Sequence, residues 1–407
     1  MRVLLLNQCF HPDVVSTAQH LSDLAVELAR RGHAVTVVAS ARGYDNPDIR
    51  FPKREQWNGV NIIRIPNLGL GKQAKWRRAL NFGSYLLSCV LRLAVLPRFD
   101  VVVALTSPPL ISFLGALFVR FKGGRFVFWV MDLNPDEAVA AGWLRAGSSI
   151  EKLLTKMLVY SLKKADYVIA LDRFMRERVV AKGISAEIVA VLPPWSHDEA
   201  VSFDAAGRAA FRARHELGDQ FVVMYAGNHS PCHPLDTLLA AAQQLAEHKE
   251  IVFCFMGGGS GFEQVQTFVC DHRLTNVRCL PYQPLAQLAG ALSAADLQVV
   301  VMGEAFRGIS HPCKIYNVLK IGTPFLVIGP VLSHLGDIVA GGGGRQAHLF
   351  GHGEAAAVAA CILKASVEHR DHPVTDGSLG ARFSKASLLP QMMALLERQT
   401  SQVQPDA

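Results

Sequence analysis

The sequence lacks the features that mark several common classes of protein. Its eight cysteines form no CxxC pair and show no spacing typical of a metal site, and several lie inside apolar runs. A free thiol in such a run behaves as a small hydrophobic side chain. We therefore expect no disulfide framework, no bound metal, and a reducing, cytoplasmic compartment. Charged residues make up only 18% of the 407 residues and hydrophobic residues 50%, which excludes a mainly disordered chain.

Long hydrophobic runs are also absent. No uninterrupted apolar run reaches the ~18 residues that a bilayer-spanning helix needs. The segment 101–119 is split by the sequence TSPP, and the segment 79–96 is interrupted by Arg92. The start of the chain has no charged leader before a long apolar stretch, so we expect no signal peptide. Basic residues flank 79–96, which leaves two interpretations open: a buried helix, or a helix on the cytoplasmic face of the inner membrane.

The positive charge is spread along the chain and not gathered in one stripe. A net charge of +7 is compatible with nucleic acid, an anionic membrane or a phosphorylated substrate. A nucleic-acid-binding protein should show a dense basic stripe, whereas the densest cluster here is Lys72, Lys75, Arg77 and Arg78, beside an apolar segment. We therefore expect no nucleic-acid partner.

Strand and helix patterns alternate in two series, and a chain of this length predicts two domains. In the first series we expect strands at 2–6, 33–39, 60–65, 100–105, 126–131 and 167–171, with helices at 16–31, 111–120 and 150–164. In the second we expect strands at 220–225, 251–256, 277–280, 297–301 and 325–328, with helices at 234–247, 261–269, 285–292 and 312–319. A proline-rich break at 192–194 separates the two series.

This alternation predicts an α/β protein with two Rossmann-like, doubly wound domains facing a central cleft. We expect the first domain at 1–194 and the second at 195–380. The remaining segment, 381–407, ends in a frayed tail, and one interpretation is that its helix crosses back to the first domain.

Glycines end two strands of the second domain. Gly227 lies in the segment YAGN, and Gly257 and Gly258 lie in the segment FMGGG. A glycine after a strand lets a phosphate approach the backbone amides, and the dipole of the following helix favours its charge. An ordinary strand-to-helix turn explains the same residues, so the glycines alone leave both interpretations open.

The segment 308–324 offers the strongest group of polar residues. Ser310 and Pro312 lead into a predicted helix, whose free amides and nearby Lys314 could hold a diphosphate. Asn317 lies three residues beyond the lysine, on the same face, where it could bind a ribose or sugar hydroxyl. The alternative is a capped surface helix with a solvated lysine.

Strand ends of the first domain carry a second group of polar residues. Asp132 follows a predicted strand, and its carboxylate could stabilise positive charge that develops on a sugar ring. Asp136 suits the N-cap of the next helix. Four loop residues could line the same cleft: Gln8, His11, Ser16 and Ser107. We interpret His11 as a loop histidine and not as a catalytic base.

Seven segments carry a resemblance that spans nearly the whole chain. They are the opening LLLNQCFHPDVVSTAQHLSDLAVELARRGHAVTVV, TSPPL, VMDLNPD, YAGN, FMGGG, SAADL and HPCKIYNVLKIGTP. Together they resemble retaining GT-B glycosyltransferases of family 4, within the group that makes colanic-acid-type surface polysaccharides.

The resemblance implies that the second domain holds a nucleotide-sugar donor, a UDP- or GDP-sugar, without a cofactor. The first domain would hold the acceptor. From the residues themselves we expect Asp132 as the catalytic residue and a saccharide acceptor, and a polyprenyl-diphosphate-linked saccharide would fit the hydrophobic, basic segment 72–98. The implied donor-binding residues are Gly227, Asn228, His233, Gly257, Gly258, Tyr282, Ser310, Pro312, Lys314 and Asn317. The implied acceptor-side residues are Gln8, His11, Ser16, Ser107 and Asp136.

The sequence departs from this family pattern at three places. Asn317 and Ile309 occupy the two glutamate positions of the E-x7-E signature, so both carboxylates are missing. The first loop, usually rich in glycine, contains Ser16, and the basic residue often found after YAGN is replaced by a run with His233. Two alternatives therefore stay open: a GT-B-fold nucleotide-sugar epimerase, and a non-catalytic module that binds nucleotide sugars.

Overall fold

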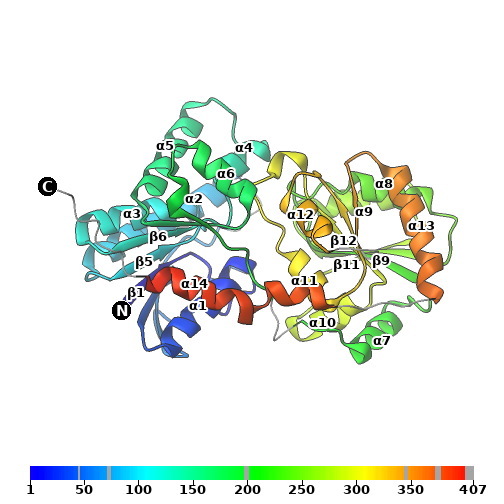
Figure 1. Ribbon diagram of the computed structural model, residues 1–407, viewed down its shortest axis with the longest axis horizontal. Coiled ribbons are helices and arrows are strands. Elements are labelled where there is room, and N and C mark those ends of the chain that lie inside the picture. The colour runs from blue at the N-terminus through cyan, green and yellow to red at the C-terminus, as the bar shows by residue number, and fades with distance from the viewer. Residues whose placement is uncertain (45, 71–74, 197–200, 343–346, 372–376, 399–407) are drawn as a thin grey trace. The chain divides into compact units, whose positions relative to one another are not determined.

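The chain folds into two compact units, each built on its own sheet (Figure 1). The computed structural model describes residues 1–44, 46–70, 75–196, 201–342, 347–371 and 377–398. Unit 1 comprises Met1–Pro193 together with the chain from Leu388, and unit 2 comprises Pro194–Ser387. The predicted α/β class with two Rossmann-like domains is confirmed. The segment 381–387, which we had assigned to the C-terminal helix segment, belongs to unit 2.

Unit 1 contains an eight-stranded sheet in the order β3-β4-β2-β1-β5-β6-β7-β8, parallel except for the β3–β4 pair. Its strands are β1 (Arg2–Leu6), β2 (Ala34–Ser40), β3 (Arg54–Trp57), β4 (Val60–Ile65), β5 (Val101–Ala104), β6 (Arg125–Trp129), β7 (Tyr167–Ala170) and β8 (Val189–Val191). Its helices are α1 (Ser16–Arg30), α2 (Lys75–Val95), α3 (Ile111–Lys122), α4 (Asp136–Ala140), α5 (Ser149–Lys164) and α6 (Arg173–Ala181). Every residue of β5 is buried, as expected for a central parallel strand with helices on both faces.

Unit 2 contains a six-stranded parallel sheet in the order β11-β10-β9-β12-β13-β14. Its strands are β9 (Phe221–Asn228), β10 (Ile251–Gly258), β11 (Val277–Leu280), β12 (Leu297–Val301), β13 (Phe325–Ile328) and β14 (Ala347–Phe350). Its helices are α7 (Ala205–Arg214), α8 (Asp236–Gln244), α9 (Phe262–Asp271), α10 (Leu285–Ser293), α11 (Lys314–Ile321), α12 (His334–Ala340) and α13 (Ala355–Asp371).

Each sheet has one point where the order of strands reverses. In unit 1 this point lies between β1 and β5, and in unit 2 it lies between β9 and β12. The loops that follow the two strands diverge there, and in open α/β sheets this opening at the carboxyl edge is where ligands bind. The fold alone therefore directs attention to the loops after β1 and β5 and to those after β9 and β12.

The last helix, α14 (Lys385–Glu397), returns to unit 1, to which the chain from Leu388 belongs. The Glu397 carboxylate pairs at 3.0 Å with both Arg31 and His33. The Arg125 guanidinium donates to the Leu396 carbonyl at 2.6 Å. Five apolar side chains of this stretch are buried: Leu388, Leu389, Met392, Met393 and Leu396. The stretch from Leu388 to Leu396 is thus part of the core of unit 1.

No helix within the described ranges is long and apolar enough to cross a membrane. The segment 79–96 lies almost wholly in α2. Of the basic cluster that precedes it, Lys72 lies outside the described residues, as do the side chains of Lys75 and Arg78.

Candidate functional site

The two glycine-ended strands of unit 2 stay paired beyond the point where the sequence predicts their ends. Gly227 pairs with Gly257 in the register of β9 and β10. Their φ angles are +135° and +143°, in the region that disfavours L side chains. A Cβ on Gly257 would lie 2.0 Å from the Gly227 carbonyl oxygen, so no side chain fits there. Gly257 is therefore explained by close backbone packing, whereas Gly227 faces a side chain from α11.

That side chain is Lys314, the first residue of α11. Although the residue is partly exposed, its ammonium nitrogen is buried and has no hydrogen-bond partner among the described residues. The nitrogen lies 3.8 Å from the centroid of the Tyr225 ring, and a Cβ on Gly227 would lie 3.1 Å from it. Burial lowers the pKa of Lys314 to about 7. The alternative of a solvated surface lysine is therefore wrong, and a cation is held beside the Gly227 turn.

Two histidines surround this lysine, and both are neutral at pH 7. His229 Nδ1 lies 3.0 Å from the Gly227 carbonyl oxygen, and burial followed by the charge of Lys314 lowers its pKa to about 4. His233 Nδ1 lies 2.8 Å from the Val301 carbonyl oxygen at the end of β12, and burial lowers its pKa well below the usual range. His233 thus ties the loop after β9 to β12, at the reversal point. We did not predict His229, although it directly follows YAGN.

The remaining predicted donor-side residues surround the same sheet edge. The Tyr282 hydroxyl lies 3.4 Å from the Gly258 carbonyl oxygen, and 59% of this tyrosine is exposed. Ser310 and Pro312 lie in the connection to α11, but Pro312 is not in its first turn, because Cys313 occupies the N-cap position. Asn317 lies one turn after Lys314 and is partly exposed.

In unit 1 the structure brings two predicted acceptor-side residues together. The Gln8 amide donates to the Ser107 carbonyl at 2.6 Å, across the reversal point between β1 and β5. The Ser107 amide in turn donates to the Asn7 side-chain oxygen at 3.2 Å. The Gln8 side-chain oxygen is buried and has no hydrogen-bond partner in the described part of the chain. It is an acceptor available to a hydroxyl group.

His11 and Ser16 are engaged in local contacts of unit 1. The His11 ring stacks on Trp57 with centroids 4.0 Å apart, and burial lowers its pKa. The Ser16 hydroxyl lies 3.3 Å from His20 Nδ1, one turn along α1. Neither contact indicates a role as a base, which agrees with our interpretation of His11 as a loop histidine.

The two predicted carboxylates of unit 1 differ in their surroundings. Asp132 follows β6 and is partly exposed. Asp136 forms an ion pair with Lys182 at 2.8 Å. The expectation that Asp136 caps α4 is wrong, because it is the first residue of that helix and Pro135 occupies the N-cap position. The carboxylate of Asp136 is thus engaged by a lysine.

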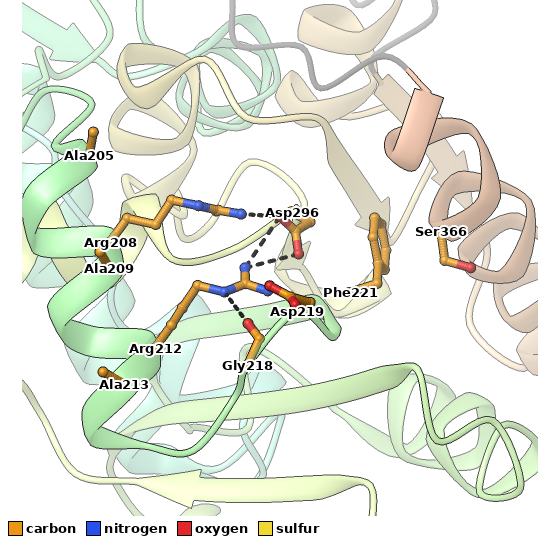
Figure 2. Close-up of a pocket in the computed structure, with 10 residues that line it drawn as sticks. All are labelled: Ala205, Arg208, Ala209, Arg212, Ala213, Gly218, Asp219, Phe221, Asp296 and Ser366. Atoms are coloured by element: carbon orange, nitrogen blue, oxygen red, sulfur yellow. Dashed lines mark hydrogen bonds and ion pairs between the residues drawn. The ribbon is translucent and has the colours of Figure 1, made fainter.

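A cavity of about 600 Å³ lies elsewhere in unit 2, at the edge where the strands begin (Figure 2). Arg208 and Arg212 reach into it from α7 and pair with Asp296 at 2.6 and 3.1 Å. The same guanidinium groups donate to carbonyls at the end of α10, including that of Ser293 at 2.7 Å. Because Asp296 and backbone carbonyls of unit 2 already engage these guanidinium groups, we do not assign a ligand to this cavity.

The two parallel sheets with helices on both faces define an α/β protein of the GT-B type. HepE of Anabaena in complex with UDP-glucose has a TM-score of 0.72 at 16% identity, covering 97% of this chain and 99% of that one. Sucrose-phosphate synthase from Thermosynechococcus elongatus has a TM-score of 0.76 at 17% identity, covering 97% and 98%. At these identities the similarity establishes the fold alone.

Sequence comparison adds information about unit 1 and about the whole chain. Residues 17–195 match the family described as a glycosyl transferase 4-like domain. A protein of Escherichia coli K12 named as a colanic acid biosynthesis glycosyl transferase, WcaI, is 24% identical over 353 residues, which cover 83% of this chain and 86% of that protein. The chain is thus similar to proteins named as glycosyltransferases over most of its length.

Proposed function

We propose that this protein is a glycosyltransferase that moves a sugar from a nucleotide-sugar donor to a saccharide acceptor in surface polysaccharide biosynthesis. The observation that carries the proposal is the buried Lys314 ammonium, which has no hydrogen-bond partner in the part of the chain that the structure describes and lies next to Gly227 at the reversal point of the unit 2 sheet. A buried charge without a counter-ion is unfavourable, and a diphosphate would supply that counter-ion. The similarity to proteins named as glycosyltransferases favours neither an epimerase nor a non-catalytic module.

In this proposal Lys314 binds the diphosphate of the donor and stabilises the charge that the nucleotide diphosphate gains as it leaves. A preorganised cation in a site that excludes water is worth far more than in bulk solvent. The lysine supplies the positive charge, so we propose that transfer requires no metal cofactor. We further propose a UDP-sugar as donor, because HepE, which shares the fold, is described with UDP-glucose.

The acceptor side of the proposal rests on unit 1. We propose Asp132 as the catalytic carboxylate, which would stabilise an oxocarbenium-like transition state, with retention of the anomeric configuration. The unpartnered Gln8 oxygen would accept a hydrogen bond from an acceptor hydroxyl. We propose a saccharide carried on a polyprenyl diphosphate as the acceptor, since the apolar segment 79–96 with basic residues on both sides suits a lipid-linked substrate.

The experiment is thermal unfolding with UDP-, GDP- and ADP-sugars, with sugar release followed in parallel. A donor at 100 times its dissociation constant stabilises the protein by about 2.7 kcal/mol. Lys314→Met should abolish this effect and at pH 6 should stabilise the ligand-free protein by roughly 2 kcal/mol, because it removes a buried charge. The matched control is Lys364→Met, since the Lys364 side chain is 76% exposed and carries an exposed ion pair with Glu368.

The outcomes separate the components of the proposal. Stabilisation by one nucleotide class, lost only in Lys314→Met, supports the donor site. Binding without sugar transfer to any saccharide acceptor would leave a nucleotide-sugar-binding module and contradict the enzymatic role. If no nucleotide sugar stabilises the protein, the proposal is wrong.

A further inference from the structure

Helix α2 is apolar on two opposite faces. One face packs into unit 1 through Tyr85, Cys89, Leu93 and Leu96, all of which are buried. The other face is exposed, and each of its apolar residues has between 48% and 71% of its surface accessible to solvent. These residues are Trp76, Leu80, Leu87, Leu91 and Val95. The spacing of these exposed residues by four and seven positions puts them in a single stripe. A helix that covers a sheet needs only one apolar face, so the packing of unit 1 does not explain the second.

A further exposed aromatic residue lies on the neighbouring helix, α3. Helices α2 and α3 are in contact, and the Phe99 ring after α2 lies 6.2 Å from the Phe118 ring of α3. Phe121, in the last turn of α3, is 79% exposed. We call the exposed stripe of α2 together with Phe121 the α2–α3 apolar surface.

The two helices that carry this surface are basic in composition. Helices α2 and α3 contain six Lys or Arg residues and no Asp or Glu. Arg77 lies over the ring of Trp76, with 5.3 Å between its guanidinium carbon and the ring centroid. Arg98, between the two helices, is exposed. An apolar stripe with basic residues beside it and a tryptophan at one end is the pattern of a helix that lies in the headgroup region of a bilayer.

We infer that the α2–α3 apolar surface docks onto a membrane that contains anionic lipids. The apolar side chains would enter the boundary between headgroups and acyl chains, and the basic residues would contact anionic headgroups. A second copy docked by the same surface would bring like charges together, because a two-fold interface pairs a surface with itself. The inference extends the proposed function, because a lipid-linked acceptor would lie in the membrane onto which this surface docks. Binding to vesicles requires no nucleotide-sugar donor and can therefore be tested separately.

The test is flotation of the full chain with vesicles of phosphatidylcholine alone and of phosphatidylcholine with phosphatidylglycerol, at low and high salt. We expect flotation with the anionic vesicles at low salt and its loss in high salt. The triple variant Leu87→Ser, Leu91→Ser, Val95→Ser should lower partitioning by more than about tenfold. The matched control is Val331→Ser, Leu332→Ser, Val367→Ser in unit 2, where the three side chains are 60% to 68% exposed.

Several results would overturn the inference. They are absence of flotation with anionic vesicles, equal flotation of the triple variant and the wild type, or a loss in the control variant as large as in the triple variant. Sedimentation equilibrium of the same samples tests for a second copy: a dimer that the triple variant abolishes would identify that copy as the occupant. The nucleotide-induced thermal shift is measured in parallel, so failed flotation with an intact shift removes only this inference.

Discussion

The reversal points of the two sheets are alike in topology but differ in what they leave unpaired. In unit 1, Gln8 and Ser107 join the two loops by a backbone hydrogen bond of 2.6 Å, and the neutral Gln8 side-chain oxygen there is buried without a partner among the described residues. In unit 2, the Lys314 ammonium and the neighbouring His229 Nε2 are the buried groups that have no partner in the described part of this site. A neutral acceptor suits a hydroxyl group, whereas a buried cation suits an anion. The comparison favours a division of labour in which unit 2 binds the diphosphate and unit 1 binds a sugar.

The free-energy cost of burying the Gln8 oxygen in unit 1 differs from that of burying the Lys314 ammonium in unit 2. A buried neutral polar atom without a partner costs roughly 1–3 kcal/mol, and an unpaired charge costs more unless it loses its proton. Burial lowers the pKa of Lys314 to about 7, so unit 2 reduces its cost by partial deprotonation. Unit 2 should therefore respond to pH near neutrality in a way that unit 1 does not.

The largest effect on stability is expected from Gly257→Ala, which places a side chain between the paired ends of β9 and β10 in unit 2. The new Cβ would lie 2.0 Å from the Gly227 carbonyl oxygen, at a φ of +143°. We expect a loss of roughly 3 kcal/mol or more in the free energy of unfolding of unit 2, measured by denaturant titration. Gly353→Ala is the control, because Gly353 has a φ of +89° but open space around its Cβ position. Equal losses in the two variants would show that backbone strain, and not collision, explains Gly257.

The next effect is the pH dependence of donor binding. The donor pairs with the protonated lysine, so affinity should be constant below pH 7 and fall about tenfold per pH unit above it. Lys314→Arg should remove this dependence, because an arginine stays protonated. Titration calorimetry between pH 6 and 9 measures both profiles. A flat wild-type profile would contradict the pairing of Lys314 with the diphosphate.

The lowered pKa of Lys314 also determines how the free energy of unfolding changes with pH. Above pH 7 the folded chain releases the Lys314 proton, while the unfolded chain keeps it up to the ordinary lysine pKa of 10.5. The unfolded state therefore binds more protons in this window, and the contribution of this lysine to stability rises with pH. The gain is lost as the pH falls through about 7.

The smallest effect is expected from Gln8→Leu in unit 1. Replacing this buried acceptor by an apolar side chain relieves the cost of an unpaired oxygen, so the free energy of unfolding should rise by roughly 1 kcal/mol. The KM for the acceptor should rise, and the thermal shift induced by the donor should stay as in the wild type. Steady-state kinetics with varied acceptor measures the first quantity. A lost donor-induced shift would contradict the division of labour between the units.

Most strands could be predicted because they are apolar runs with glycine, proline or polar residues at their ends. The strand β3 was missed, since its sequence REQW has no apolar alternation, although the turn after it contains Asn58 and Gly59 at positive φ. The continued pairing at Gly227 was missed because it depends on the neighbouring strand. Pairing between strands is a tertiary property that the local sequence does not carry.

The residues of the candidate site could be predicted from sequence better than their environments could. The motif around Lys314 indicated a phosphate-binding cation, but its burial depends on Tyr225, 89 positions earlier in the chain. His229 was missed because a histidine after a strand has no pattern of its own. The pairing of Asp136 with Lys182 joins two helices and could not be read from either segment.

The return of α14 to unit 1 sets the order in which the protein can be completed during synthesis. Leu388 and the buried residues after it belong to unit 1, but the ribosome makes them after the whole of unit 2. Unit 2 is continuous in sequence and has all its strands before that point. The unit that begins first is thus finished last, and until then the surface that α14 will cover is available to chaperones.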